Sequence, residues 1–144
     1  MKYRVLLAVA ATLFFPILVS ACGCVPSCDE YFGKAKQCVL ERLNRSAAVF
    51  TGKVTSIEQQ KDNPALFKAV FAVATSWKGI SSETVDVYYY DLIGSGCPFS
   101  LKVGSTYSFF ALSVESKLYA GECDSAAGYE RYLPKGKRWR TRNK

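Results

Sequence analysis

The sequence predicts a mainly β protein, a small five-stranded barrel with a short helix before it. Apolar and polar residues alternate over most of residues 46–120, which is the periodicity of half-buried strands. Short turn-forming stretches interrupt this alternation four times, as expected of strands joined by tight connections. An apolar leader precedes six cysteines, which indicates that disulfides fix the N-terminus of an exported chain.

An export signal is expected at residues 1–21. Lys2 and Arg4 precede an apolar run from Val5 to Val19, and this order is typical of a secretory signal peptide. A helix over that run would rise only about 22 Å, which is short of the roughly 30 Å hydrocarbon core of a bilayer. We therefore expect one exported domain at 22–133 that is secreted, periplasmic or lipid-anchored to the cell envelope.

The cysteine count and the absence of histidine narrow the chemistry. Six cysteines in an exported chain are expected to form disulfides rather than a zinc site, although their spacing leaves the pairing open. In an extended "CGC" the two cysteines point to opposite faces, which suits two separate anchors. The chain has no histidine, which excludes the usual His-based triads and zinc enzymes. We expect a non-enzymatic protein without a cofactor.

A helix is expected near the start of the domain, in "SCDEYFGKAKQCVLERLN". Ser27 and Glu30 have the spacing of a capping box. In one straight helix Cys28 and Cys38 would lie about 15 Å apart, whereas the Cα atoms of bridged cysteines lie within about 7 Å. If these two pair, the helix must break or begin after Gly33. The apolar residues at helical steps are Phe32, Ala35, Val39 and Leu43.

Five strands follow the helix. The first, in "AAVFTGKVTSIEQ", contains Gly52, and a glycine inside a strand marks a sharp coil or a bulge. A long first strand that coils between two sheets closes a five-stranded Greek-key barrel, so we expect the oligonucleotide/oligosaccharide-binding (OB) type. The residues expected on the inner faces of the first three strands are Phe50, Gly52, Val54, Phe67, Ala69, Phe71, Val73, Val85, Val87 and Tyr89.

The last two strands, in "STYSFFALSV" and "KLYAGE", are expected to form a hairpin that turns at residues 115–116. In that register Cys123 lies opposite Ser108, and Cys97 lies well before that position. These two late cysteines are therefore not expected to pair with each other, and each needs a partner elsewhere.

Several motifs, taken in order, resemble the netrin-like modules, whose best-known members are the tissue inhibitors of metalloproteinases. They are "CGCVP", "SAAVFTGKV", "WKG", "CPFSLKVGSTYSFFA" and "LYAGEC", and together they cover residues 22 to about 124. The resemblance implies an OB-type barrel whose first C-x-C is bridged to the cysteine before the fourth strand and to the one after the fifth. The pairs that it implies here are Cys22 with Cys97, Cys24 with Cys123 and, as the remaining pair, Cys28 with Cys38.

The resemblance also implies that Cys22, once N-terminal, binds the catalytic zinc of another protein, a metalloproteinase. Such a zinc keeps one coordination position open for water, which a neutral α-amine and the carbonyl of the same residue can fill as a chelate. An α-amine titrates near 8, so the neutral form is available. Gly23 would face the first primed pocket of the enzyme. Inhibitors of the family usually present a side chain there, so we expect weaker inhibition from this chain.

The same stretch supports a second interpretation, because "VSAC" also resembles a bacterial lipobox, in which the cysteine becomes acylated. Lipidation would place the sulfur of Cys22 in a thioether and commonly its amine in an amide. The residue could then neither bridge Cys97 nor chelate zinc. The protein would be a lipoprotein of the cell envelope, attached to the membrane only by its lipid and acting as a protein- or glycan-binding module.

A basic tail is expected at 134–144. Loss of the leader lowers the net charge from +7 to +5, and six cations lie in the last ten residues, "KGKRWRTRNK". Such a tail can contact a polyanion, and we expect it to be solvated and poorly ordered, with Trp139 at its centre. Its cations are Lys135, Lys137, Arg138, Arg140, Arg142 and Lys144.

Two further groups of residues are expected to be structural. Tyr88, Tyr89 and Tyr90 could stack bases on an OB surface, but an exported protein rarely meets single strands, so we expect no nucleic-acid partner. Four carboxylates lack a recognisable spacing for glycosidase chemistry and are expected at solvated strand ends. They are Asp86, Asp91, Glu115 and Glu122.

Overall fold

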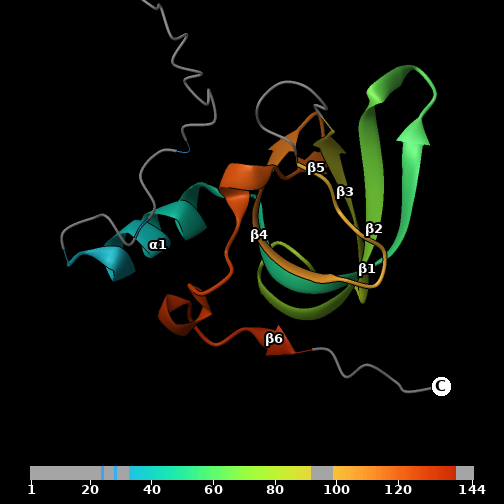
Figure 1. Ribbon diagram of the computed structural model, residues 1–144. Coiled ribbons are helices and arrows are strands. Elements are labelled where there is room, and N and C mark those ends of the chain that lie inside the picture. The colour runs from blue at the N-terminus through green and yellow to red at the C-terminus, as the bar shows by residue number, and fades with distance from the viewer. Residues whose placement is uncertain (1–23, 25–27, 29–32, 92–98, 139–144) are drawn as a thin grey trace, which may run out of the picture.

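The computed structural model describes Cys24, Cys28, residues 33–91 and residues 99–138 (Figure 1). The expected leader at 1–21, the capping box of Ser27 and Glu30, and the end of the tail beyond residue 138 lie outside these residues. None of the described helices is long and apolar enough to cross a membrane.

Five strands pair into a closed ring. They are β1 (Ala48–Gln60), β2 (Asn63–Lys78), β3 (Thr84–Tyr90), β4 (Thr106–Val114) and β5 (Lys117–Tyr119). β1 pairs with both β2 and β4, β2 pairs with β3, and β5 joins β3 to β4. β3 and β5 run parallel, whereas the other neighbours in the ring are antiparallel. This mainly β, five-stranded ring is the OB-like fold that the sequence predicts.

β1 closes the ring because it is long and coiled enough to pair on both of its sides. Residues 48–53 pair with β4, and residues 49–60 pair with β2. A Cβ atom on Gly52 would lie only 2.9 Å from the carbonyl oxygen of Ala72 and 3.2 Å from Cβ of Phe71. Glycine is therefore the residue that lets β1 approach β2 at the coil, as its place inside the strand predicts.

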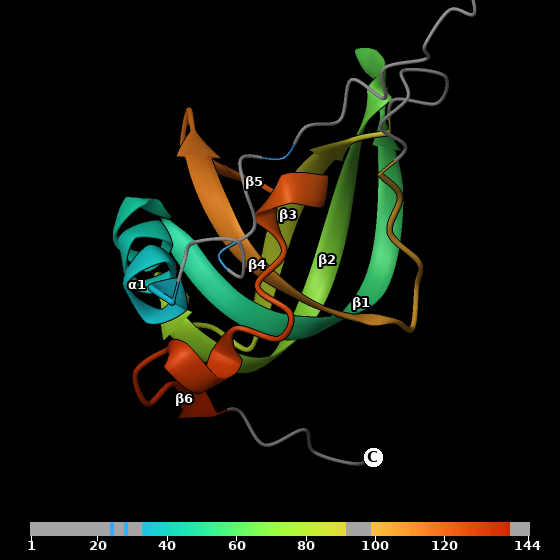
Figure 2. The same ribbon diagram turned by 60° about the vertical axis from the view of Figure 1, so that its left-hand side comes forward.

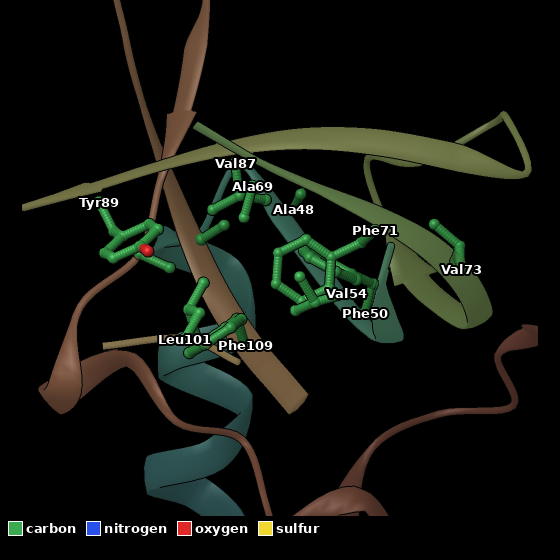
Figure 3. Packing of buried hydrophobic residues seen from close by; sticks show 12 residues of the cluster. Ala48, Phe50, Val54, Ala69, Phe71, Val73, Val87, Tyr89, Leu101 and Phe109 are labelled. Carbon is green, nitrogen blue, oxygen red and sulfur yellow. The ribbon is translucent and has the colours of Figure 1, made fainter. Parts of the chain in front are cut away.

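Phenylalanine rings from three strands meet at the centre of the barrel (Figure 3). Phe50 of β1 and Phe71 of β2 meet edge-on with ring centroids 5.4 Å apart, and Phe109 of β4 lies 6.0 Å from Phe71. This geometry is favoured between aromatic rings. Alternation predicted the inner faces correctly. Buried as expected are Phe50, Gly52, Val54, Ala69, Phe71, Val73, Val87 and Tyr89, whereas Phe67 and Val85 are partly buried against the same core.

The helix α1 (Ala35–Arg45) packs outside the barrel (Figure 1). It begins just after Gly33, whose φ of 73° lies in the left-handed region, so the expected break after this glycine is present. Val39 is fully buried in a second cluster with Val49 and Phe110. Of the other residues expected on this face, Ala35 and Leu43 are half-buried, and Phe32 lies outside the described residues.

The motif W-K-G joins the end of β2 to α1 and to the start of β1. Trp77 packs against the second cluster. The Nζ of Lys78 donates to the carbonyls of Leu43 and Asn44, each at 2.9 Å, where a helix end presents unpaired acceptors and favours a cation. Gly79 has a φ of 75°, and a Cβ atom there would lie 2.1 Å from the carbonyl oxygen of Ala47. The motif therefore has a structural role.

Gly104 and Tyr107 of the motif "CPFSLKVGSTYSFFA" shape the turn before β4. Gly104 has a φ of 87°, and its N–H donates to the carbonyl of Val54 at 2.8 Å. The N–H of Lys102 donates to the hydroxyl of Tyr107 at 3.1 Å. The glycine supplies the left-handed backbone and the tyrosine closes the turn.

The β4–β5 hairpin has the expected register at its tip but is shorter than predicted. Glu115 and Ser116 form the turn with positive φ angles, and the pairing continues to Leu112 opposite Tyr119. The chain then leaves the sheet and forms the short 3-10 helix η2 (Glu122–Asp124). The expectation that Cys123 faces Ser108 is therefore wrong.

The folded part of the chain continues past the expected boundary at residue 133. After the 3-10 helix η3 (Glu130–Tyr132), strand β6 (Lys137–Arg138) pairs with Thr75 and Ser76 of β2. A Cβ atom on Gly136 would lie 2.8 Å from Thr75 and 2.9 Å from Trp77. This glycine lets the chain cross the end of β2 closely, so Lys137 and Arg138 of the tail belong to the sheet.

The two motif glycines give a matched pair of variants. Gly79→Ala and Gly104→Ala both place alanine at a positive φ, which costs about 1–2 kcal/mol. Nothing lies within 4 Å of a Cβ atom on Gly104, whereas the one on Gly79 meets backbone. We expect Gly79→Ala to lower the free energy of unfolding by at least about 3 kcal/mol and Gly104→Ala by the smaller amount, measured by urea titration. Equal losses would contradict the structure.

Candidate functional site

Two disulfides attach the N-terminal segment to the fold. Cys24 is bonded to Cys123 with Cα atoms 5.2 Å apart, and Cys28 is bonded to Cys38 with Cα atoms 5.6 Å apart. Both are pairs that the resemblance implies. The third implied pair, Cys22 with Cys97, lies outside the described residues, as does Gly23.

The two bonds hold the segment at points four positions apart along the chain. Cys24 is fixed to η2, which follows the last strand of the ring, and Cys28 is fixed to α1. Both of these elements lie on the outside of the barrel (Figure 2). A chain processed before Cys22 would therefore have its free end two residues from a covalent anchor.

The chain on either side of η2 is hydrogen-bonded to strands of the barrel, which supports the anchor at Cys123. Before η2, the N–H of Ala120 donates to the carbonyl of Tyr88 at 3.1 Å. After η2, the N–H of Ala126 donates to the carbonyl of Ser108 at 2.8 Å, and Ser125 bridges to Phe109. These contacts tie the short 3-10 helix to β3 and β4, so the anchor has a rigid base.

The anchor at Cys28 is inside the protein. Cys28 is fully buried, with Val39, Phe110 and Ala126 in the same cluster.

Ser108 is also nearly buried, and its hydroxyl contacts Thr51 at 2.6 Å and donates to Glu130 at 3.0 Å. The chain after η2 is thus fastened to the barrel.

Asp124 closes η2 beside the Cys24–Cys123 bond. Its Oδ2 accepts the N–H of Gly121 at 2.7 Å. Burial raises the pKa of this carboxyl, whereas the hydrogen bond from Gly121 and the nearby charge of Arg42 act to lower it. Ionisation of Asp124 is therefore opposed by its surroundings despite these two partners.

The described residues hold no cluster of three or more His, Cys, Asp or Glu side chains that could bind a metal. The four described cysteines are all used in disulfides, so their sulfurs are not available as ligands.

Comparison with known proteins adds no family. The chain matches no family model and no curated protein.

The three consecutive tyrosines separate into an inner and an outer group. Tyr89 is buried in the core, whereas Tyr88 and Tyr90 face outward and contact Tyr119 of β5, with ring centroids 5.7 and 6.3 Å away. Lys117 lies over Tyr88 with its Nζ 5.1 Å from the ring centroid. We call Tyr88, Tyr90 and Tyr119, together with the exposed Leu112 and Val114 of β4, the tyrosine face.

Other residues singled out in the sequence are dispersed over the fold. Lys135 and Lys137 are exposed near β6. The four carboxylates lie on β3, just after β3, in the hairpin turn and in η2. The alternation of β5 would have placed Tyr119 on the outer face. In contrast, no local pattern marks Asp124 or Arg42, because their partners are distant in the sequence.

Asp124→Asn is expected to stabilise the protein at neutral pH. Asparagine keeps an oxygen that can accept the Gly121 N–H but carries no charge. Because the pKa of Asp124 is raised in the folded state, its contribution to stability falls as the pH rises from below 3.8 through the folded value. The gain from the substitution should therefore be present at neutral pH and vanish below the ordinary value of 3.8.

The measurement is urea unfolding of both proteins across this pH range. The control is Glu122→Gln, which removes an exposed carboxylate from the same 3-10 helix and should change little. A loss of stability in Asp124→Asn at neutral pH would mean that the charge itself is needed, contrary to this account.

Proposed function

We propose that this protein is an exported, non-enzymatic binding protein of the netrin-like type, whose processed N-terminus inhibits a zinc metalloproteinase. In this proposal the α-amine and carbonyl of Cys22 fill the open coordination position of the enzyme's zinc. The observation that carries the proposal is the disulfide between Cys24 and Cys123, which fixes the chain two residues after the proposed ligand.

Rigidity is what makes such a ligand effective. A free N-terminus would lose much conformational freedom on entering an active site, whereas a preorganised one loses little. Cys24 is covalently fixed to η2, and η2 is hydrogen-bonded to β3 and β4. The base of the proposed chelate therefore has the rigidity that binding requires.

Compartment and fold both support the proposal. Disulfides persist in oxidising compartments, and two are present here. The closed five-stranded ring is the architecture that the family resemblance implies. The target is a proteinase exposed to the same compartment, and Gly23, which offers no side chain to its first primed pocket, makes binding weaker than the family pattern.

A second candidate function is that of a lipid-anchored envelope protein that binds a protein or a glycan. The sequence "VSAC" before the proposed cleavage site favours it. The tyrosine face offers a surface for such a partner, because tyrosine combines a large apolar ring with a polar hydroxyl. The two functions exclude each other, since an acylated Cys22 has neither a free sulfur nor, commonly, a free amine.

Inhibition should depend on the position of the α-amine. A single alanine added before Cys22 keeps every cysteine but moves the amine away from the carbonyl of Cys22. We expect the processed protein to inhibit at least one member of a panel of zinc metalloproteinases, and the extended protein to inhibit it at least about 30-fold more weakly, the loss expected for a central binding residue. An alanine added after Lys144 is the control and should have no effect.

Equal inhibition by the two N-terminal forms would refute chelation by the amine. Absence of inhibition across the panel would instead leave the envelope-binding function. The intact mass of the protein purified from its native host decides between the two, because acyl chains at Cys22 add mass that an unmodified, disulfide-bonded chain lacks.

A further inference from the structure

Helix α1 carries two contacts to the N-terminal anchors on one of its faces. Cys38 and Arg42 are four residues apart, which places them one turn apart on the same side of the helix. Cys38 is bonded to Cys28. Arg42 reaches across to η2, where its Nη2 donates to the carbonyl oxygen of Cys123. One helix face therefore touches both points at which the segment is fixed.

The side chain of Arg42 is held in place between the helix and the barrel. Its guanidinium carbon lies 5.1 Å from the ring centroid of Phe110, which is buried in the second cluster. A cation over an aromatic face is attracted to it. The charge of Arg42 also acts on Asp124 in the same 3-10 helix. The guanidinium thus contacts a ring and a carbonyl, and its charge acts on a nearby carboxylate.

These contacts form a continuous series of links from Cys24 to Cys28. It runs from Cys24 through its disulfide to Cys123, across the hydrogen bond to Arg42, along one turn of α1 to Cys38, and through the second disulfide to Cys28. Two of its three links between elements are covalent. The third is the hydrogen bond of Arg42, which joins α1 to η2.

We infer that Arg42 is a positioning residue for the N-terminal end of the protein. It sets the place of Cys24 relative to α1 and so the direction in which the preceding residues leave the fold. Its effect on inhibition rests on the proposed function, whereas its effect on the position of η2 does not. A planar guanidinium can lie over the ring and donate sideways at the same time, which an ammonium does less well.

The chain offers a matched control for this role. Arg45 lies in the same last turn of α1 as Arg42 and is exposed. Both cations favour the C-terminal end of the helix dipole. Arg42→Met and Arg45→Met therefore remove the same charge from the same turn and keep a long apolar stem. They differ in the contacts to Phe110 and Cys123 and in the charge near Asp124.

The test is hydrogen exchange measured by mass spectrometry on the processed, disulfide-bonded protein. In Arg42→Met we expect exchange to be roughly 10-fold faster in the peptides that carry Cys24 and Cys123, the loss expected for one charge-assisted hydrogen bond. Peptides from β1 and β2 should keep their rates. Arg45→Met should match the wild type throughout, and Arg42→Lys should restore part of the protection.

Two results would overturn the inference. One is equal exchange in Arg42→Met and Arg45→Met at the two cysteine peptides. The other is faster exchange that extends equally to the barrel, which would mean that Arg42 stabilises the whole fold. If Arg42→Met does not fold, the exchange of the milder variant Arg42→Lys is judged in the same way. In an inhibition assay, Arg42→Met should dissociate faster from the target proteinase. If the wild type inhibits nothing while the exchange pattern is as expected, the proposed function fails and the positioning role stands.

Discussion

The structure depends on the closure of the barrel by β1. Because residues 48–53 pair with β4 and residues 49–60 pair with β2, one strand belongs to both sides of the ring. The approach at Gly52, where a Cβ atom would meet the backbone of Ala72, makes this double pairing possible. Without it the sheet would have two open edges, and the phenylalanine cluster inside would be exposed.

Closure also determines where the two ends of the domain meet. The ring places β4 beside β1 and β5 beside β3, so the chain that leaves β5 lies on the outside of the barrel. There η2 receives Cys24 from the other end of the sequence, and α1 receives Cys28. The hydrogen bond from Arg42 to the carbonyl of Cys123 connects the two attachments. The surface next to the proposed N-terminal ligand is thus held by two disulfides and a hydrogen bond.

Local sequence patterns predicted most of the barrel. Alternation identified the buried face of each of the first three strands, and the turn at residues 115–116 has the expected register. The helix begins after Gly33, as the geometry of the Cys28–Cys38 bond requires. These features depend on neighbours in the sequence or on simple chain geometry, so they can be recognised from residues alone.

The contacts around the two N-terminal disulfides were less predictable, because they join residues that are far apart in the sequence. Arg42 and Cys123 are 81 residues apart in the sequence, and nothing near Arg42 distinguishes it from Arg45. Cys123 does not lie opposite Ser108 because the chain leaves the sheet after Tyr119. Strand alternation does not reveal where the pairing of two strands stops. Likewise, β6 follows from the approach of Gly136 to Trp77, whereas the basic composition alone predicted a solvated tail.

In the proposed function, the N-terminal amine of the processed protein is a ligand of another protein's metal. Cobalt in place of the catalytic zinc reports this directly, because the visible absorption of Co²⁺ changes when a water ligand is replaced by nitrogen. We expect one equivalent of the processed protein to shift the spectrum of a cobalt-substituted target proteinase, with no further change beyond that ratio. A complex that forms while the cobalt spectrum stays unchanged would contradict the central claim.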